Sequence, residues 1–210
     1  MRKLSLTLAA LFLLFTLPAC GEKETVKEAG LAIAKDGTVT CVLRDSFEKD
    51  FYDLKDLEDM IRFEVSTYNQ TKGGQSIELE SLELIDRDCI AVMKYGSYED
   101  YTLFSEVPLF VGTVKEAAEA GIDLNVTLTE AGKSNTIGRE ELEALTDYYL
   151  VVWYEDMPVS VPGKIRYCSE ELQILNFRKA LPPGTEGQTA ENTGEPAGEE
   201  AAGPFYLLYK

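Results

Sequence analysis

Residues 148–154 read Tyr148-Tyr149-Leu150-Val151-Val152-Trp153-Tyr154, a continuous run of aromatic and β-branched residues. Such residue types favour β-strands. The run lacks the polar–apolar alternation of a half-exposed strand, which indicates a strand covered on both faces. We therefore predict that it lies in the middle of the sheet. Core packing accounts for its aromatic rings, although they could instead form a platform for sugars or peptides.

Shorter strand patterns flank this run on both sides. The segments 77–85 and 89–95 predict a hairpin, with a bulge where the alternation slips at Glu80-Ser81. The apolar end of the chain, 205–209, predicts a final strand that returns to the sheet. The remaining expected strands are 38–43, 107–111, 122–128, 164–168 and 172–177.

One long helix is expected after Asp53, because apolar residues follow it at three- and four-residue steps. Asp53 is a natural N-cap, and Gly73 followed by Gly74 is a natural stop. Short helices are expected from the capping patterns at Ser97 and Thr113 and over 139–145. The sequence thus predicts an α+β fold, in which a mainly antiparallel sheet of about six to eight strands packs against one long helix and short connecting helices.

The N-terminus has the parts of a secretory signal peptide. Two basic residues precede an apolar run over 4–17, which is shorter than the roughly 20 residues needed to cross a bilayer. The run ends in Leu17-Pro18-Ala19-Cys20. This motif resembles the lipobox of bacterial lipoproteins. The resemblance implies cleavage before Cys20, lipidation of Cys20 by diacylglyceryl and palmitate chains, and anchoring on the outer face of a bacterial cytoplasmic membrane.

The rest of the chain divides by composition. Residues 1–19 form the expected signal peptide, and 20–36, rich in Glu and Lys, form the expected flexible tether. Residues 37–210 form a single domain. Within it, 182–204 consists mainly of Pro, Gly, Glu, Ala and Thr, which predicts a disordered loop because such residues bury too little apolar surface to offset their ordering entropy.

Composition excludes several functional classes. The chain has no histidine, which rules out Ser-His-Asp and Cys-His catalysis and zinc sites of the HExxH type. Its formal net charge of −17 argues against a nucleic-acid partner, because such proteins carry basic patches that contact phosphates. Carboxylate acid–base chemistry, a Ser-Lys pair and a carboxylate metal site remain open.

The motifs in the domain are weak. Ala131-Gly132-Lys133-Ser134 imitates the end of a phosphate-binding loop, but Thr127 stands where that loop needs glycine, so we expect no nucleotide. Acids cluster near the start of the long helix, where its dipole favours them. Cys41, Cys89 and Cys168 lack metal-binding spacing, and any two could form a disulfide. We predict no catalytic, metal or cofactor residues.

We therefore expect a membrane-anchored extracytoplasmic lipoprotein that acts as a non-enzymatic binding or assembly module of the cell envelope. The expected partners are the membrane, bound through the lipid on Cys20, and an envelope protein as a possible second partner. Two alternatives stay open. One is a surface hydrolase that uses carboxylates, which would require a deep pocket holding an acid of raised pKa. The other is a small solute-binding receptor, against which the short chain counts.

Overall fold

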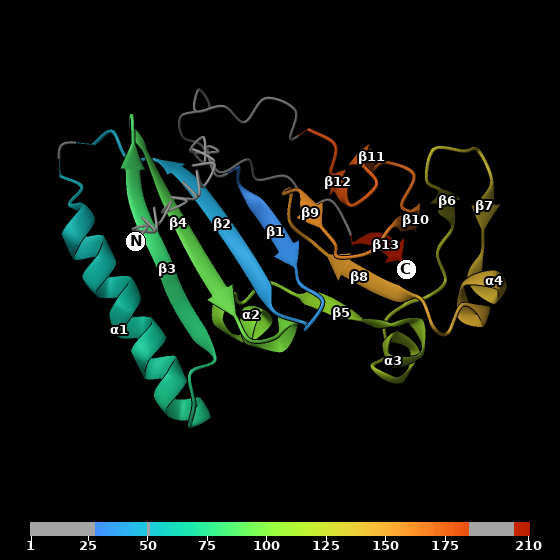
Figure 1. Cartoon of the computed structure of the whole chain (residues 1–210), viewed down its shortest axis with the longest axis horizontal. Helices are drawn as coiled ribbons and strands as arrows, with labels where there is room; N and C mark the ends of the chain where they lie inside the picture. The colour runs from blue at the N-terminus through green and yellow to red at the C-terminus, as the bar shows by residue number, and fades with distance from the viewer. Residues whose placement is uncertain (1–27, 50, 185–203) are drawn as a thin grey trace, which may run out of the picture.

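The strands of this protein form two sheets (Figure 1). The computed structural model describes residues 28–49, 51–184 and 204–210. Over these residues the chain forms a seven-stranded sheet, a six-stranded sheet and four helices. The α+β class is confirmed, but the strands are divided between two sheets where the sequence suggested one.

The seven-stranded sheet combines the first four strands of the chain with three later ones. Its strand order is β11(Gln173–Asn176), β12(Lys179–Leu181), β9(Val159–Ser160), β1(Gly30–Ile33), β2(Val39–Ser46), β4(Asp88–Tyr95) and β3(Ile77–Ile85). All neighbours pair antiparallel except β1 and β9. The predicted hairpin is β3 and β4, and the predicted bulge is confirmed as a register shift between Leu79 and Ser81.

The six-stranded sheet is antiparallel throughout. Its order is β5(Leu109–Thr113), β8(Tyr149–Trp153), β13(Phe205–Tyr209), β10(Ile165–Cys168), β6(Leu128–Glu130) and β7(Thr136–Ile137). Strand β8 lies between β5 and β13, and its residues 150–153 are buried, as the unbroken apolar run predicts. All five residues of β13 are buried, which confirms that the end of the chain is a docked strand.

The helices are α1(Leu54–Lys72), α2(Tyr98–Ser105), α3(Val114–Glu119) and α4(Arg139–Ala144). Helix α1 begins and ends at its predicted capping residues, and α2 and α3 begin after the predicted N-caps Ser97 and Thr113. The Asp53 side chain accepts hydrogen bonds from two N–H groups of the first turn of α1, and Gly73 ends that helix with a φ of 72°. Thr113 and Glu116 form the complete capping box expected for α3.

Two predictions about local structure are wrong. The segment 122–128 was expected to be a strand, but β6 starts only at Leu128. The Asp123 side chain accepts the Asn125 N–H, which forms a local turn, and the Asp123 carbonyl accepts the Tyr206 hydroxyl. The alternating apolar residues of segment 122–128, such as the buried Leu124, therefore pack into the second hydrophobic cluster, although the segment forms no strand before Leu128.

The ordered domain also starts earlier than expected. Residues 30–33, assigned to the tether, form β1 because their backbone groups pair with β2 on one side and β9 on the other. The signal peptide, Cys20 and most of the predicted loop at 182–204 lie outside the described residues, although Pro182 to Gly184 follow β12 directly. Within the described part of the chain, no helix is long and apolar enough to span a bilayer.

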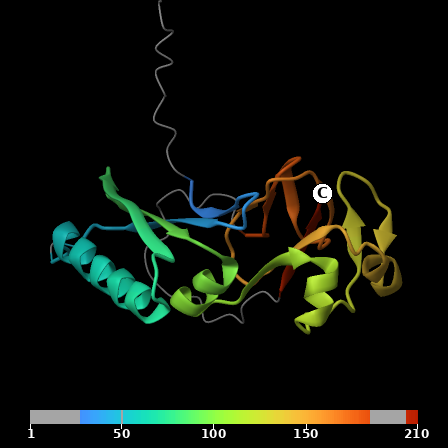
Figure 2. The same ribbon diagram turned by 60° about the horizontal axis from the view of Figure 1, so that its bottom comes forward.

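The two sheets share one core. The larger hydrophobic cluster joins Tyr95 and Leu31 of one sheet to Trp153 and Phe205 of the other. The rings of Trp153 and Phe205 lie 5.4 Å apart, on neighbouring strands. A second cluster packs α3 and α4 on the six-stranded sheet. Helix α1 lies apart from that sheet, alongside β3 at the edge of the seven-stranded sheet (Figures 1 and 2).

Candidate docking site

Helix α1 covers its sheet incompletely. None of its residues is fully buried. Ile61, Val65 and Tyr68 pack against the larger core cluster from one side of the helix. Two hollows therefore flank this row, one at each half of α1, and they differ in chemistry.

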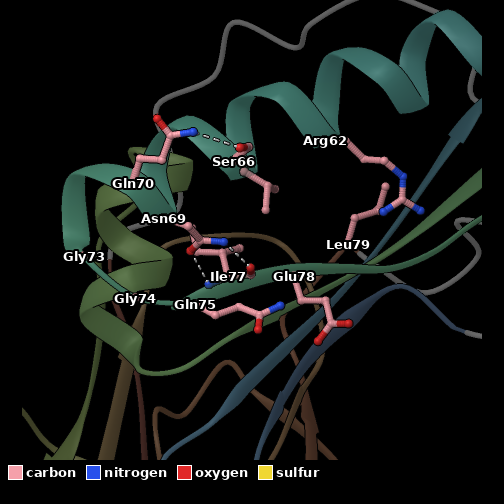
Figure 3. Close-up of a pocket in the computed structure, with 11 residues that line it drawn as sticks. Arg62, Ser66, Asn69, Gln70, Gly73, Gly74, Gln75, Ile77, Glu78 and Leu79 are labelled. Carbon is pink, nitrogen blue, oxygen red and sulfur yellow. Dashed lines mark hydrogen bonds between the residues drawn. The ribbon is translucent and has the colours of Figure 1, made fainter.

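The hollow at the C-terminal half of α1 is about 570 Å³ in volume, and many of its lining side chains carry polar groups (Figure 3). Its central side chain is Asn69, whose Oδ1 accepts the Ser76 and Ile77 N–H groups, both at 2.9 Å. Its Nδ2 donates to the Ile77 carbonyl at 2.8 Å. Gln70 donates to Ser66 beside it. These groups satisfy one another and fasten α1 to β3, so we interpret this hollow as structural.

The hollow at the N-terminal half of α1 is apolar and about 500 Å³ in volume. We name it the α1 groove. Its floor comes from β2, β3 and β4, one wall comes from α1, and the other end is closed by the segment between β2 and α1. The lining residues are Leu43, Asp45, Ser46, Phe47, Phe51, Tyr52, Asp53, Asp56, Leu57, Met60, Ile61, Leu82, Cys89 and Ala91.

Large apolar side chains of the α1 groove are exposed. Phe51 is 76% exposed, Met60 53% and Leu43 46%. Leu84, which follows Leu82 on the same face of β3, is 48% exposed. Isolated exposed apolar residues are ordinary on protein surfaces, but a contiguous set around a concavity is typical of an interaction site.

The aromatic end of the groove is held in a defined position. The rings of Phe47 and Tyr52 lie 5.0 Å apart, and those of Phe51 and Tyr52 lie 4.9 Å apart. The Lys49 ammonium group is 5.9 Å from the centres of both the Phe51 and Tyr52 rings. The Phe47 N–H donates to the Arg87 carbonyl at 2.7 Å. These contacts fix rings that would otherwise lose conformational entropy on binding a partner.

The rim of the groove is acidic. Asp45, Asp53 and Asp56 line it, and no Lys or Arg is among its described lining residues. Asp53 accepts the Lys55 and Asp56 N–H groups as the helix cap, and Asp45 accepts the Ser46 N–H. Carboxylates retain further lone pairs after such bonds. The groove therefore combines an apolar interior with anionic acceptors at its edge.

The acids noted at the start of the long helix are thus separated by the fold. Asp53 and Asp56 line the groove, whereas Glu58 and Asp59 pair along the helix with Arg62 and Lys55. Asp50 is outside the described residues. At the start of β4, the Asp88 carboxylate is buried and pairs with Arg44 at 2.6 Å.

Sequence reasoning missed the aromatic and sulfur-containing lining of the groove. The available signal was that Phe51 and Tyr52 stand directly before the N-cap, and that Met60 falls off the apolar stripe of α1. Neither observation predicts a concavity, because much of the floor comes from β3 and β4, which follow α1 in the sequence.

Other residues singled out from the sequence lie apart from the groove or serve the core. Cys41, Cys89 and Cys168 are free and buried on three different strands, with Cys89 in the groove floor. The segment 131–134 forms the turn between β6 and β7, where Lys133 pairs with Glu130 at 2.5 Å. Among the residues that the structure describes, no three Cys, Asp or Glu side chains converge as metal ligands.

One acid has the electrostatic property required by the hydrolase alternative. Burial raises the pKa of Glu155, and a hydrogen bond from the Tyr101 hydroxyl partly offsets that rise. Burial and this same bond raise the pKa of Tyr101. Glu155 lines neither hollow beside α1. Its bond instead ties α2 to the residues that follow β8, which is a structural role.

Comparison of the chain with protein-family models, with curated proteins and with solved structures finds no match. The function must therefore be inferred from the geometry of the molecule itself. The α1 groove is the feature that best fits a recognition role.

Proposed function

We propose that this protein is a membrane-anchored extracytoplasmic lipoprotein whose domain is a non-enzymatic binding module. In this proposal the α1 groove receives an amphipathic helix of an envelope protein, with apolar side chains inserted into the groove and basic side chains at its rim. The single observation that carries it is the exposure of Phe51, Met60 and Leu43 around one acidic-rimmed concavity.

The chemistry of the groove supports a helical, basic partner. Amphipathic helices commonly bind by laying an apolar face into a hydrophobic groove. Aromatic side chains in such grooves carry much of the binding energy. Asp45, Asp53 and Asp56 would attract Lys or Arg and repel an acidic helix, so the rim selects between partners of equal apolarity.

The position of the groove is compatible with a lipid anchor. Gly30 pairs with Val42, and β1 and β2 are antiparallel, so the chain enters β1 from the same end of the sheet at which β2 leaves toward Phe47. The described chain thus begins at the end of the sheet that carries the aromatic end of the groove.

Binding can be tested with two synthetic amphipathic peptides of equal length, one of Leu and Lys and the other of Leu and Glu. We expect the full chain to bind the Leu/Lys peptide at least tenfold more tightly in fluorescence anisotropy. Replacing Phe51 and Met60 by Ser should weaken that binding at least tenfold, since it removes two of the inserted contacts. The matched control is Leu103→Ser, which removes an equally exposed side chain from α2.

The proposal fails if the two peptides bind equally well, or if the Leu103→Ser change weakens binding as much as the groove changes do. In cells, a photo-crosslinking amino acid at position 60 should capture an envelope protein. The same amino acid at position 103 should not capture it. Thermal unfolding of each variant separates lost binding from lost folding.

A further inference from the structure

A second groove lies at the opposite end of β2 from the α1 groove. It is about 600 Å³ in volume, and its lining residues are Lys35, Tyr149, Pro162, Gly163, Lys164, Phe177, Arg178, Tyr209 and Lys210. We name it the cationic groove. Lys35 is in the turn from β1 to β2, and the start of β2 at Val39 is about 13 Å, at 3.3 Å per residue, from Leu43, where the α1 groove begins on that strand. The two sites are therefore independent.

The charge of the cationic groove is opposite in sign to the net charge of the whole chain. The protein has 37 acidic and 20 basic residues, yet four of the lining residues are Lys or Arg and no Asp or Glu is among the described ones. Within the described chain, Lys35, Lys164 and Arg178 form no ion pair, whereas Lys210 pairs with Asp147 at 2.6 Å. Clustered cations that have no ion-pair partner among the described residues create a local positive potential.

The backbone holds this groove in a defined shape. Lys164 and Lys210 exchange main-chain hydrogen bonds, the Lys164 N–H donating at 2.8 Å and the Lys210 N–H at 3.1 Å. The Ile165 N–H donates to the Phe177 carbonyl at 2.9 Å, and the Val161 N–H donates to the Arg178 carbonyl at 2.8 Å. These bonds bring together three segments that are distant in sequence.

Close packing at Gly163 keeps the same region compact. A Cβ atom there would lie 2.7 Å from the Tyr209 ring and 2.8 Å from the main-chain carboxyl group of Lys210. Glycine is required because any side chain would push these segments apart. The floor of the groove is thus rigid, while its charged side chains reach into solvent.

Two aromatic rings give the groove flat apolar surfaces. Tyr149 stacks on Tyr209 with centroids 5.4 Å apart and remains 46% exposed. Phe177 is 60% exposed and carries the Arg178 guanidinium 5.1 Å from its ring centre. The faces of such rings are electron-rich and pack well against polarised C–H groups. The cations beside them are hydrogen-bond donors without acceptor atoms.

We infer that the cationic groove binds a small anionic carbohydrate, with a sugar ring against the exposed aromatic faces and its acid group among Lys35, Lys164 and Arg178. A sugar acid matches both features of the groove. Its C–H groups can pack against the aromatic rings, and its acid oxygens can accept hydrogen bonds from the cations. The volume lies within the usual range for ligand sites. The net charge of −17 would repel a long polyanion, which favours a ligand of one or a few charges.

Calorimetric titration of the full chain tests this inference with three probes. Digalacturonate carries carboxylates, glucose 6-phosphate carries a phosphate, and the dimethyl ester of digalacturonate is a neutral match for the first. We expect at least one of the two anionic sugars to bind at least tenfold more tightly than the ester. Which one binds shows whether the acid group is a carboxylate or a phosphate.

Variants locate the site. Lys35→Gln combined with Lys164→Gln should weaken binding of the anionic sugar at least tenfold, because two of the four cations that line the groove are lost. Phe177→Ser should weaken it severalfold while keeping the charge. The matched control, Lys55→Gln on α1, removes a cation at a distance and should leave affinity unchanged.

The inference is overturned if neither anionic sugar binds, if the neutral ester binds equally well, or if the double Lys variant binds like the parent. All the replaced side chains are exposed, and thermal unfolding confirms that each variant folds. The α1 groove variants Phe51→Ser and Met60→Ser should bind the sugar normally, which keeps this result separate from the peptide test.

Discussion

The Tyr101 hydroxyl group donates a hydrogen bond to the Glu155 carboxylate and thereby connects α2 to the residues after β8. Tyr101 is almost fully buried, and its ring packs edge-on against Tyr95 at 5.1 Å. Burial raises the pKa of both tyrosines, and Cys41 lies near them. This polar contact therefore sits in the core that the two sheets share.

The raised pKa of Glu155 predicts a pH dependence of stability. An acid whose folded pKa exceeds its unfolded value binds its proton more tightly in the folded state, so stability is greatest below the unfolded pKa and falls as pH rises through the folded pKa. Glu155→Gln removes this titration, and the fall in unfolding free energy above about pH 4.5 should become shallower. Urea melts at several pH values would measure it.

The exposed acid Glu64 on α1 supplies the control for that experiment. Glu64→Gln should leave the pH profile of stability unchanged. Tyr101→Phe should cost about 1 to 3 kcal/mol, because it leaves the half-buried Glu155 carboxyl group without the hydrogen bond from Tyr101. A pH profile that Glu155→Gln leaves unaltered would show that this carboxyl group does not couple to folding.

Shortening a side chain of β13 should destabilise the protein strongly. Leu207 is fully buried between β8 and β10, so Leu207→Ala is expected to lower the free energy of unfolding by about 2 to 5 kcal/mol through lost burial and a cavity. Leu175→Ala on β11 should change it by no more than about 0.5 kcal/mol, since that side chain is 46% exposed. Equal denaturant midpoints for the two variants would contradict the docking of the last strand.

The Asn69 side chain should contribute more to the free energy of unfolding than that of Gln70, its neighbour on α1. Asn69→Ala leaves the Ser76 and Ile77 N–H groups without their acceptor and should cost about 1 to 3 kcal/mol. Gln70→Ala removes a bond only to Ser66 and should change stability by less than about 0.5 kcal/mol. Guanidinium melts of the pair decide whether this amide fastens α1 to β3.

The thiol groups should be protected in the native state. Burial raises the pKa of Cys41 to about 12 and that of Cys168 to about 11, and it also raises the pKa of Cys89. Because the thiolate is the reactive form, a disulfide reagent at pH 8 should react slowly with the folded chain. After unfolding, three thiols should react in a Cys20→Ala protein. Fewer would reveal a disulfide.

Cys20 should control localisation, because the lipid supplies the membrane affinity in the lipoprotein hypothesis. Cys20→Ala should release the domain or leave it unprocessed, and labelled fatty acid should no longer be incorporated. Cys89→Ala, which leaves the lipobox intact, should be labelled like the parent. Equal labelling of the Cys20→Ala protein would refute the lipobox interpretation.

Local patterns were sufficient for the elements whose cause is local. Asp53 and Gly73 marked the ends of α1, and the run 148–154 identified a strand covered on both faces. Both features could be predicted because capping and continuous burial depend on residues that are adjacent in the sequence. The segment 122–128 shows the limit of such reasoning. Its alternation matched that of a strand, but none of the described strands pairs with residues 122–127.

The sequence by itself determined the α+β class, the capped helices, the β3–β4 hairpin with its bulge, and a final strand at 205–209. Only the tertiary structure decided that the strands divide into two sheets and that β1 belongs to the domain. It alone also formed the two grooves, whose walls come from residues more than a hundred positions apart in the cationic case. Strand pairing and the shape of a groove depend on which distant segments come into contact. Hydrophobic periodicity reports only local structure, so it does not predict those contacts.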